Sequence, residues 1–326
     1  MRSKSPVLST AGLVAAGAAA LTWTAYRRDL AEARRRIENG RQCIDTPEGV
    51  IEFGESGDGP AALVIHGAGG GFDQGLTLGR ALLGDAWRVV APSRFGYLGT
   101  PLPLNASASA QADAHRHLLD ALQLDAVPVI GISAGAPSAM QLCVRHPERC
   151  TSLVLVVPLA WAPNRKLDEG SPLIAAMLHA ITRSDFVYWS AMRFARDSMI
   201  GTILGTPADI YHAAAPDERK HADQILEQML PVSRRAAGIR NDEIVSATLP
   251  RFPLENIQVP ALVFSSADDG YRTYDGALYA SELIPGGEFA GYQTGGHLLM
   301  GHTADVRAHI ARFLTRSMHA EATAVS

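Results

Sequence analysis

The sequence has few cysteines and no excess of positive charge. Its three cysteines (Cys43, Cys143 and Cys150) are an odd number without a C-x-x-C pair, so neither a zinc site nor a disulfide-stabilised scaffold is predicted. Reduced thiols packed around a helix are the favoured interpretation of Cys143 and Cys150. A net charge of −4 argues against nucleic acid as the main partner. The sequence contains no internal repeat.

Motifs for binding phosphate, a dinucleotide or a metal are also missing. The glycine run from Gly67 to Gly71 would need a further glycine at Phe72 for G-x-G-x-x-G, and no Lys-Ser or Lys-Thr pair follows for a P-loop. His115 and His117 lie in a predicted helix, but histidines two positions apart diverge on a helix, so a metal site is rejected. No cofactor and no metal are therefore predicted.

The most informative stretch runs from Val127 to Pro137, where one serine lies between two glycines. An apolar, β-branched run ends at Gly131, and a helical pattern begins after Gly135. G-x-S-x-G between a strand and a helix is the nucleophile-elbow arrangement. A serine in so sharp a turn is strained and neighbouring chain passes close to it, which explains the flanking glycines. Ser133 is therefore the predicted nucleophile.

Two loops are predicted to supply the backbone amides of an oxyanion hole. The first is the turn after the serine, where the amide of Ala134 opens the following helix. The other is the glycine run that follows the buried apolar strand over residues 61–65, with Ala68 as the donor. A merely flexible glycine turn is the alternative interpretation of that run.

A doubled carboxylate and a histidine follow later predicted strands. Asp268 and Asp269 come directly after an apolar run that begins at residue 259, at the end of a strand where open α/β sheets keep their sites. His297 follows Gly295-Gly296 after a last strand over residues 287–292, and we predict that it is the general base. His302 is the alternative base, but it lies near the start of the final helix rather than on the glycine loop.

The order Ser, Asp, His resembles that of the α/β-hydrolase fold superfamily, from about Val50 to Leu314. The His66-Gly67 run, the serine elbow and the Gly-Gly-His stretch coincide in this resemblance. Among members with a cap domain, the chain is similar to meta-cleavage-product hydrolases and small esterases, because residues 265–274 resemble their Asp-Asp pair and short aromatic-containing loop. The resemblance implies Asp269 as the acid that orients the histidine, with Asp268 as the alternative.

The sequence departs from this family pattern at two places. Thr273-Tyr274 replaces a proline that usually stands a few residues past the acid, and Ser93 occupies a position where many relatives carry Asp. Both departures bear on the substrate class more than on the triad. Relatives with dehalogenase or epoxide hydrolase activity have aspartate where Ser133 stands, so those activities are set aside.

The predicted fold is an α/β-hydrolase fold, a mostly parallel sheet flanked by helices with a helical cap inserted after the sixth strand. With 326 residues, 47% of them hydrophobic, the chain is long and apolar enough to bury the core of one large α/β domain. A strand over 50–55 is expected to form a hairpin through the turn at 56–60. Core residues are predicted at 46–158 and 253–317, the cap at 159–252 and a disordered tail at 318–326. Methionines and aromatics of the cap, such as Met177, Met192 and Phe194, could line an apolar pocket; for each one, the cap's own core is favoured.

The N-terminal residues 1–26 form a hydrophobic segment, followed by a predicted charged linker helix over 27–45. Pro6–Tyr26 carries no charge and is long enough to span a bilayer. Trp23 and Tyr26 before two arginines are typical of a membrane interface, which favours an uncleaved anchor of undetermined orientation. Cleavage of a signal peptide near Ala18–Ala20, giving a secreted or periplasmic protein, is the alternative.

Together these features predict a carboxylesterase-like serine hydrolase. Ser133 would attack a small-molecule acyl substrate to form an acyl-enzyme, and His297 would act as general base, held by Asp269. Hydrolysis of a C–C bond in a diketone-like substrate and acyl transfer are alternatives on the same triad. A non-catalytic binding protein of the same fold is the alternative of another class, and the intact set of three residues argues against it.

Overall fold

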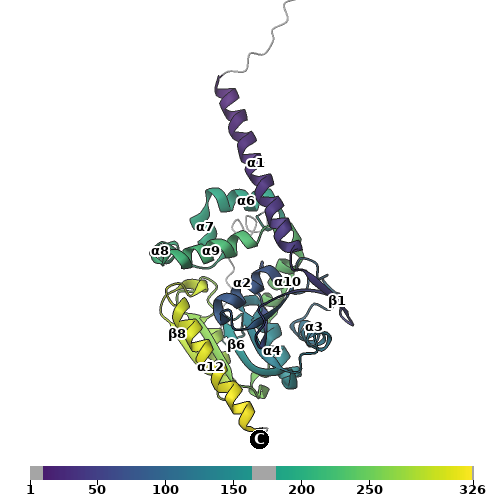
Figure 1. Cartoon of the computed structure of the whole chain (residues 1–326). Coiled ribbons are helices and arrows are strands. Elements are labelled where there is room, and N and C mark those ends of the chain that lie inside the picture. Colours follow the sequence, from purple (N-terminus) through teal and green to yellow (C-terminus); the bar gives the residue numbers. More distant parts are fainter. Residues whose placement is uncertain (1–9, 164–180, 325–326) are drawn as a thin grey trace, which may run out of the picture.

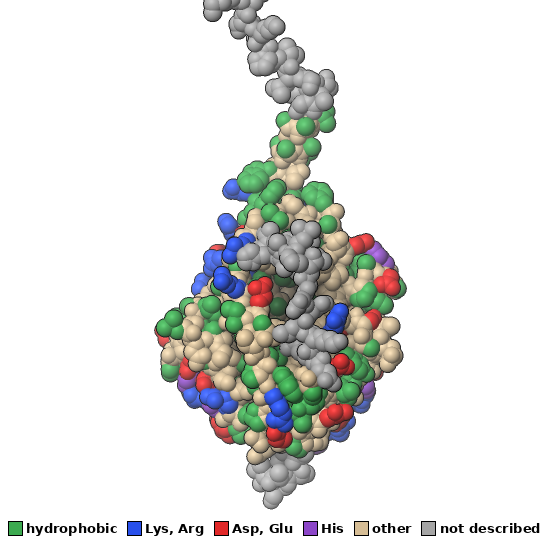
Figure 2. All heavy atoms as spheres, turned by 180° about the vertical axis from the view of Figure 1, so that it is seen from behind, with side chains coloured by type: hydrophobic (Ala, Val, Ile, Leu, Met, Phe, Trp, Pro, Cys, Tyr) green, Lys and Arg blue, Asp and Glu red, His purple; other side chains and the backbone are tan. Residues whose placement is uncertain are grey.

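A computed structural model describes residues 10–163 and 181–324 of the chain (Figure 1). In this part of the chain, eight strands form one sheet in the order β1-β2-β4-β3-β5-β6-β7-β8. The β1–β2 and β2–β4 pairs are antiparallel, and the other pairs are parallel. Helix α1 (Thr10–Glu38) projects from one end of the molecule, as Figure 2 also shows from behind.

The central strands alternate their apolar side chains between two faces of the sheet. Leu63 and Ile65 belong to the core on one face, whereas Ala62 and Val64 belong to the core on the other. Because both faces are apolar, both need a layer of helices. The strands are β1 (Gln42–Thr46), β2 (Gly49–Ser56), β3 (Ala61–Ile65), β4 (Arg88–Pro92), β5 (Val127–Ile132), β6 (Cys150–Val156), β7 (Ala261–Ser266) and β8 (Glu288–Tyr292).

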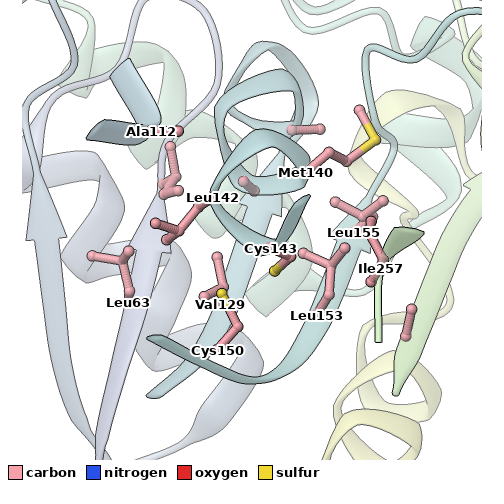
Figure 3. Close-up of a cluster of buried hydrophobic side chains, with 14 of the residues drawn as sticks. Leu63, Ala112, Val129, Met140, Leu142, Cys143, Cys150, Leu153, Leu155 and Ile257 are labelled. Atoms are coloured by element: carbon pink, nitrogen blue, oxygen red, sulfur yellow. The ribbon is translucent and has the colours of Figure 1, made fainter. Parts of the chain in front are cut away.

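Helices cover the sheet on each side. Three of them, α3 (Ala108–Ala121), α4 (Ala136–Arg145) and α11 (Tyr274–Leu283), pack on one face; α2 (Phe72–Leu83) and α12 (Thr303–Ala324) pack on the other. Figure 3 shows the first layer, where Leu142 of α4 lies over the strands. Cys143 and Cys150 are buried there as free thiols, which agrees with the predicted packing role.

The predicted helical cap lies between β6 and β7, and its helices lie above one end of the sheet (Figure 1). Its described helices are α6 (Asp185–Phe194), α7 (Arg196–Ile203), α8 (Ala208–Ala213), α9 (Pro216–Gln228) and α10 (Ala236–Ala247). Tyr188, Trp189 and Met192 are buried in a core of the cap itself, as favoured from the sequence. Phe194 is exposed instead, and Met177 lies outside the described residues.

Helix α1 is not a free linker, because its second half packs into the cap. Tyr26, Leu30, Ala33 and Ile37 lie on one face of the helix and are all buried. The first three belong to the same core as the cap helices. The Arg36 guanidinium anchors the helix further, since it donates to the Leu230 carbonyl at 2.6 Å. Residues 27–38 are helical as predicted, but the helix ends at Glu38 rather than at 45, and its packing on the cap contradicts the predicted role of a linker.

Three local predictions need correction. Strand β1 begins at Gln42, within the range predicted as the linker helix. It is a largely exposed edge strand, so its sequence does not alternate between apolar and polar residues as a half-buried strand does. No hairpin forms through 56–60, because β2 pairs with β1 and β4 rather than with β3. Helix α12 continues to Ala324, so the predicted tail at 318–326 is helical over its described residues. Alanine, glutamate and methionine in this stretch favour a helix intrinsically.

The predicted bilayer-spanning segment is not supported. Among the helices of residues 10–163 and 181–324, none combines the length and the apolar content needed to cross a membrane. Residues 6–9 of the predicted segment lie outside the described part of the chain.

The docking of α1 on the cap predicts unequal effects of two leucine substitutions in one helix. Leu30→Ala removes a buried side chain and should lower the free energy of unfolding by about 2–3 kcal/mol. Leu21→Ala changes a side chain that is 74% exposed, and it should change that free energy by less than about 0.5 kcal/mol. Urea unfolding measures both, and equal effects would mean that α1 does not pack on the cap.

Candidate active site

The serine elbow has the strained geometry that its sequence predicts. Ser133 follows β5 directly and has a φ of +50°, in the left-handed region that L-residues rarely adopt. A Cβ atom at Gly131 would lie 2.6 Å from the Ala139 Cβ, and one at Gly135 would lie 2.5 Å from the Ile65 carbonyl oxygen. Neighbouring chain therefore leaves room only for glycine on both sides of the serine.

The structure brings together the three predicted side chains of the triad. The Ser133 Oγ lies 2.9 Å from Nε2 of His297, and Nδ1 of that imidazole lies 2.9 Å from Oδ2 of Asp269. Ser133 follows β5, Asp269 lies in the loop that begins after β7, and His297 comes after β8. The carboxyl ends of these strands lie along one edge of the sheet. This geometry fixes one ring nitrogen as the donor to the carboxylate and leaves the other to accept the serine proton.

The two adjacent carboxylates have different partners. Asp269 contacts the imidazole, whereas Asp268 accepts hydrogen bonds from the backbone amides of Gly295 at 3.1 Å and Gly296 at 2.9 Å. Asp268 thus binds the loop that carries His297 rather than the ring itself. The ring of His302 stacks on Tyr292 with centroids 4.1 Å apart, and the histidine within reach of Ser133 is His297.

The environment of Asp269 keeps its carboxylate ionised. Burial alone would raise its pKa, but the neighbouring His297, the Thr273 hydroxyl and the Tyr271 amide outweigh burial and lower the pKa of Asp269 below its usual value. Thr273 was missed as a site residue, although it is part of the departure that replaces the family's proline. Its hydroxyl donates to the carboxylate, so this departure supplies a hydrogen bond to the acid.

The two predicted oxyanion amides belong to chain segments that adjoin the serine. The glycine run passes close to it, because a Cβ at Gly67 would lie 3.1 Å from the Ser133 Cβ. Within the described residues, no protein group accepts a hydrogen bond from the Ala68 amide, which leaves it available for a ligand. Ala134 directly follows the serine at the start of the short 3₁₀ turn Ser133–Gly135. Each such donor typically stabilises an oxyanion by about 3 kcal/mol.

Two buried arginines hold the glycine run, and sequence reasoning missed both. Arg94 donates to the carbonyls of His66 at 2.9 Å and Gly67 at 3.1 Å, and it also pairs with Asp242 of the cap at 2.7 Å. Arg235 of the cap donates to the Gly70 carbonyl. Each arginine therefore connects the cap to the loop of Ala68. Arg94 stands in a loop after a predicted strand, which gave a weak signal, and nothing in the local sequence marked Arg235.

The histidine at the start of this loop is neutral. His66 is buried, and burial together with the nearby Arg94 charge holds its pKa well below the usual value. Its Nε2 accepts from the Arg94 amide at 3.1 Å, so Nδ1 carries the proton and donates to the Gly67 carbonyl at 2.7 Å. His66 is thereby a structural partner of the loop.

The histidines of α3 lie away from the triad. His115 is buried beside the Ser138 hydroxyl at 3.2 Å, and His117 contacts Glu48. Across the described residues, no three His, Cys, Asp or Glu side chains are grouped so that they could hold a metal ion.

Comparison with known proteins identifies the family. Residues 60–301 match the family model of the alpha/beta hydrolase fold, and the chain belongs to this family. It is 27% identical over 277 residues to the uncharacterized hydrolase YcgS of Bacillus subtilis, a match that covers 82% of this chain and 93% of that protein. The family and the fold class predicted from the sequence are thus confirmed, and the chain is a member of a hydrolase family.

Two further comparisons agree with this assignment. The alpha/beta hydrolase fold protein from Nakamurella multipartita has a TM-score of 0.72 and 26% identity, covering 84% of this chain and 98% of that one. A shorter stretch of 106 residues is 33% identical to a 2-hydroxymuconate semialdehyde hydrolase from a Pseudomonas species, covering 31% of this chain and 38% of that protein.

The different partners of the two carboxylates predict unequal effects of two matched substitutions. Asp269→Asn should lower kcat by about 10⁴-fold, because an amide no longer holds the imidazole in the tautomer that accepts the serine proton. Asp268→Asn replaces one acceptor of a backbone amide and should lower kcat by about tenfold at most. Steady-state kinetics of both variants on one ester decide the matter, and the reverse order would move the acid to Asp268.

Proposed function

We propose that this protein is a serine hydrolase that cleaves a carboxylic ester through an acyl-enzyme on Ser133. The observation that carries the proposal is the hydrogen-bonded series from Asp269 through His297 to the Ser133 hydroxyl, with both contacts at 2.9 Å. Membership of a family of hydrolases supports the same class of reaction. The strained backbone of Ser133 also favours a chemical role, because such strain gathers at functional sites.

The proposed reaction has two halves. In the first, the Ser133 Oγ attacks the acyl carbon while His297 Nε2 takes its proton, and the amides of Ala68 and Ala134 bind the resulting oxyanion. The C–O bond to the alcohol then breaks, and His297 returns the proton to the leaving oxygen. In the second half, His297 deprotonates a water molecule that attacks the acyl carbon. The bond from that carbon to the Ser133 Oγ then breaks, and His297 returns the proton to Oγ, which releases the carboxylic acid and restores the serine.

A second candidate is hydrolysis of a C–C bond in a diketone-like substrate by the same three residues. The local likeness to a 2-hydroxymuconate semialdehyde hydrolase favours this candidate over acyl transfer. A panel that contains both p-nitrophenyl esters and diketones separates the two reactions by which substrates are turned over.

The proposed role of Ser133 predicts the loss of ester hydrolysis in one variant. Ser133→Ala should lower kcat for p-nitrophenyl acetate or butyrate by at least about 10⁴-fold, because the acyl-enzyme cannot form. Release of p-nitrophenol, followed by absorbance, measures this. A matched control is Ser138→Ala, at a buried serine on α4 whose hydroxyl contacts His115 and the Gly135 carbonyl but no side chain of the triad. Turnover of the Ser133→Ala variant above a few per cent of wild type would contradict the assignment.

We also propose that the protein associates with a lipid surface through α1. The supporting observation is an apolar patch on α1 and the adjoining cap helix, whose large side chains are exposed. It consists of Leu21 (74% exposed), Trp23 (51%), Phe186 (39%), Val187 (40%) and Phe194 (72%). Apolar and basic side chains gather where this helix meets the body in Figure 2. Aromatic side chains beside arginines are typical of membrane interfaces.

Local contacts make this half of α1 compatible with lipid. The hydroxyls of Thr22 and Thr24 donate to the carbonyls of Ala18 at 2.9 Å and Ala20 at 2.8 Å, so they do not need water as a partner. The helix residues 14–20 are all exposed and carry no charge.

Flotation with vesicles of phosphatidylcholine and phosphatidylglycerol tests this proposal. The full chain should float with the vesicles. The double variant Trp23→Ala/Phe194→Ala should bind the vesicles at least about tenfold more weakly, because it loses two apolar contacts. Leu104→Ala, at an exposed leucine of a core loop, should bind like wild type. Wild-type protein that stays at the bottom of the gradient would contradict the proposal, as would a soluble native product that begins after Ala20.

A further inference from the structure

A short segment of the cap reaches down to the triad. The segment consists of residues 202–206, which are the last two residues of α7 and the first three of its connection to α8, and we call it the bridging segment. Leu204 is buried in the core of the cap. The next residue, Gly205, contacts both the loop after β7 and the loop after β8. The segment therefore connects the packing of the cap to the two loops that carry the acid and the base.

One carbonyl oxygen joins these two loops. The carbonyl of Gly205 accepts a hydrogen bond from the backbone amide of His297 at 3.1 Å and another from the amide of Gly270 at 2.9 Å. Gly270 directly follows Asp269 in the chain. One acceptor of the cap therefore binds both loops at once, in addition to the bonds that Asp268 makes directly to the loop of His297.

Side chains of the bridging segment and the acid loop add two contacts. The Thr206 hydroxyl, which is fully buried, accepts from the amide of Leu298 at 3.3 Å and donates to the Leu204 carbonyl at 3.1 Å. The Tyr271 hydroxyl donates to the Ile203 carbonyl at 2.9 Å. Together with the two bonds to the Gly205 carbonyl, these contacts hold the loops of the base and the acid against the cap.

Only glycine fits at position 205. Its φ of +54° lies in the left-handed region, and a Cβ there would stand 2.6 Å from the Tyr271 ring and 3.1 Å from the His297 Cβ. Tyr271 meets the imidazole edge to face, with ring centroids 4.8 Å apart. A methyl group at this position would consequently push on the catalytic histidine and on the ring that packs beside it.

We propose that Gly205 and Thr206 are positioning residues for the triad, so that the cap and the sheet together fix the geometry of Asp269, His297 and Ser133. Neither residue touches the reacting atoms; both act through the backbone that carries the imidazole. The inference rests on the proposed serine-hydrolase function. It implies that a displacement of the cap changes the rate of the chemical step and not only access to the site.

Two glycine substitutions in the same part of the cap test the proposal. Gly205→Ala should lower kcat by about 10- to 100-fold with KM changed by less than about twofold, because a misplaced base affects the transition state more than substrate binding. Gly201→Ala is the control: this glycine lies four residues earlier in α7, and a Cβ there would meet nothing within 4 Å. The variant should keep wild-type kcat and thermal stability.

A second pair of variants guards against failure of Gly205→Ala to fold. Thr206→Val removes the acceptor for the Leu298 amide and should lower kcat by about tenfold, whereas Thr206→Ser keeps the hydroxyl and should restore it. The apparent pKa in the kcat/KM profile should shift in the valine variant and return in the serine variant. A mere loss of stability would lower the amount of active enzyme and leave that profile unchanged.

A readout without turnover separates this inference from the proposed function. Proton NMR reports the low-field signal of the His297 Nδ1–H that is bonded to Asp269, which Asp269→Asn assigns by removing it. The signal should persist in Gly201→Ala and shift or disappear in Gly205→Ala and Thr206→Val. If no ester is turned over by wild type, the proposed function fails and the NMR comparison still decides the positioning role. An unchanged signal and unchanged kcat in both variants would overturn it.

Discussion

The contact on which the site depends is the imidazole of His297, held between the carboxylate of Asp269 and the hydroxyl of Ser133. The sheet makes this contact possible, because β5, β7 and β8 end at one edge and each contributes one of the three residues. Asp268 then holds the loop of the imidazole, and Thr273 holds the orienting carboxylate. Each of these contacts restricts the position or the rotation of the imidazole, so the arrangement of the three side chains is fixed before a substrate binds.

The site contains costly features that only a well-packed surrounding can maintain. Ser133 has a strained backbone, and the guanidinium groups of Arg94 and Arg235 are buried. Both arginines have carbonyl and carboxylate partners, which offset the cost of removing a charge from water. These arginines join the loop of Ala68 to the cap, and the carbonyl of Gly205 joins the loops of the base and the acid to it. The cap is therefore part of the site and not simply a cover for it.

The sequence predicted the parts of this structure that depend on local patterns. The buried strands appear as apolar runs, and the nucleophile elbow appears because a strained serine needs glycine on each side. Contacts between distant segments leave no local signal, which is why the roles of Arg235 and Gly205 were not predicted. The second half of α1 was misjudged for the same reason: its charged residues suggested a linker, while the apolar face that packs on the cap becomes evident only beside its partner helices.

The most direct test of the account is to identify the residue that reacts with a fluorophosphonate. Labelled protein is digested, and mass spectrometry locates the adduct. The account predicts a single adduct on Ser133, with labelling slowed at least tenfold by His297→Gln, because the imidazole no longer takes the serine proton. An adduct at another residue, or labelling of Ser133 at an unchanged rate in that variant, would contradict the central claim that His297 activates this serine.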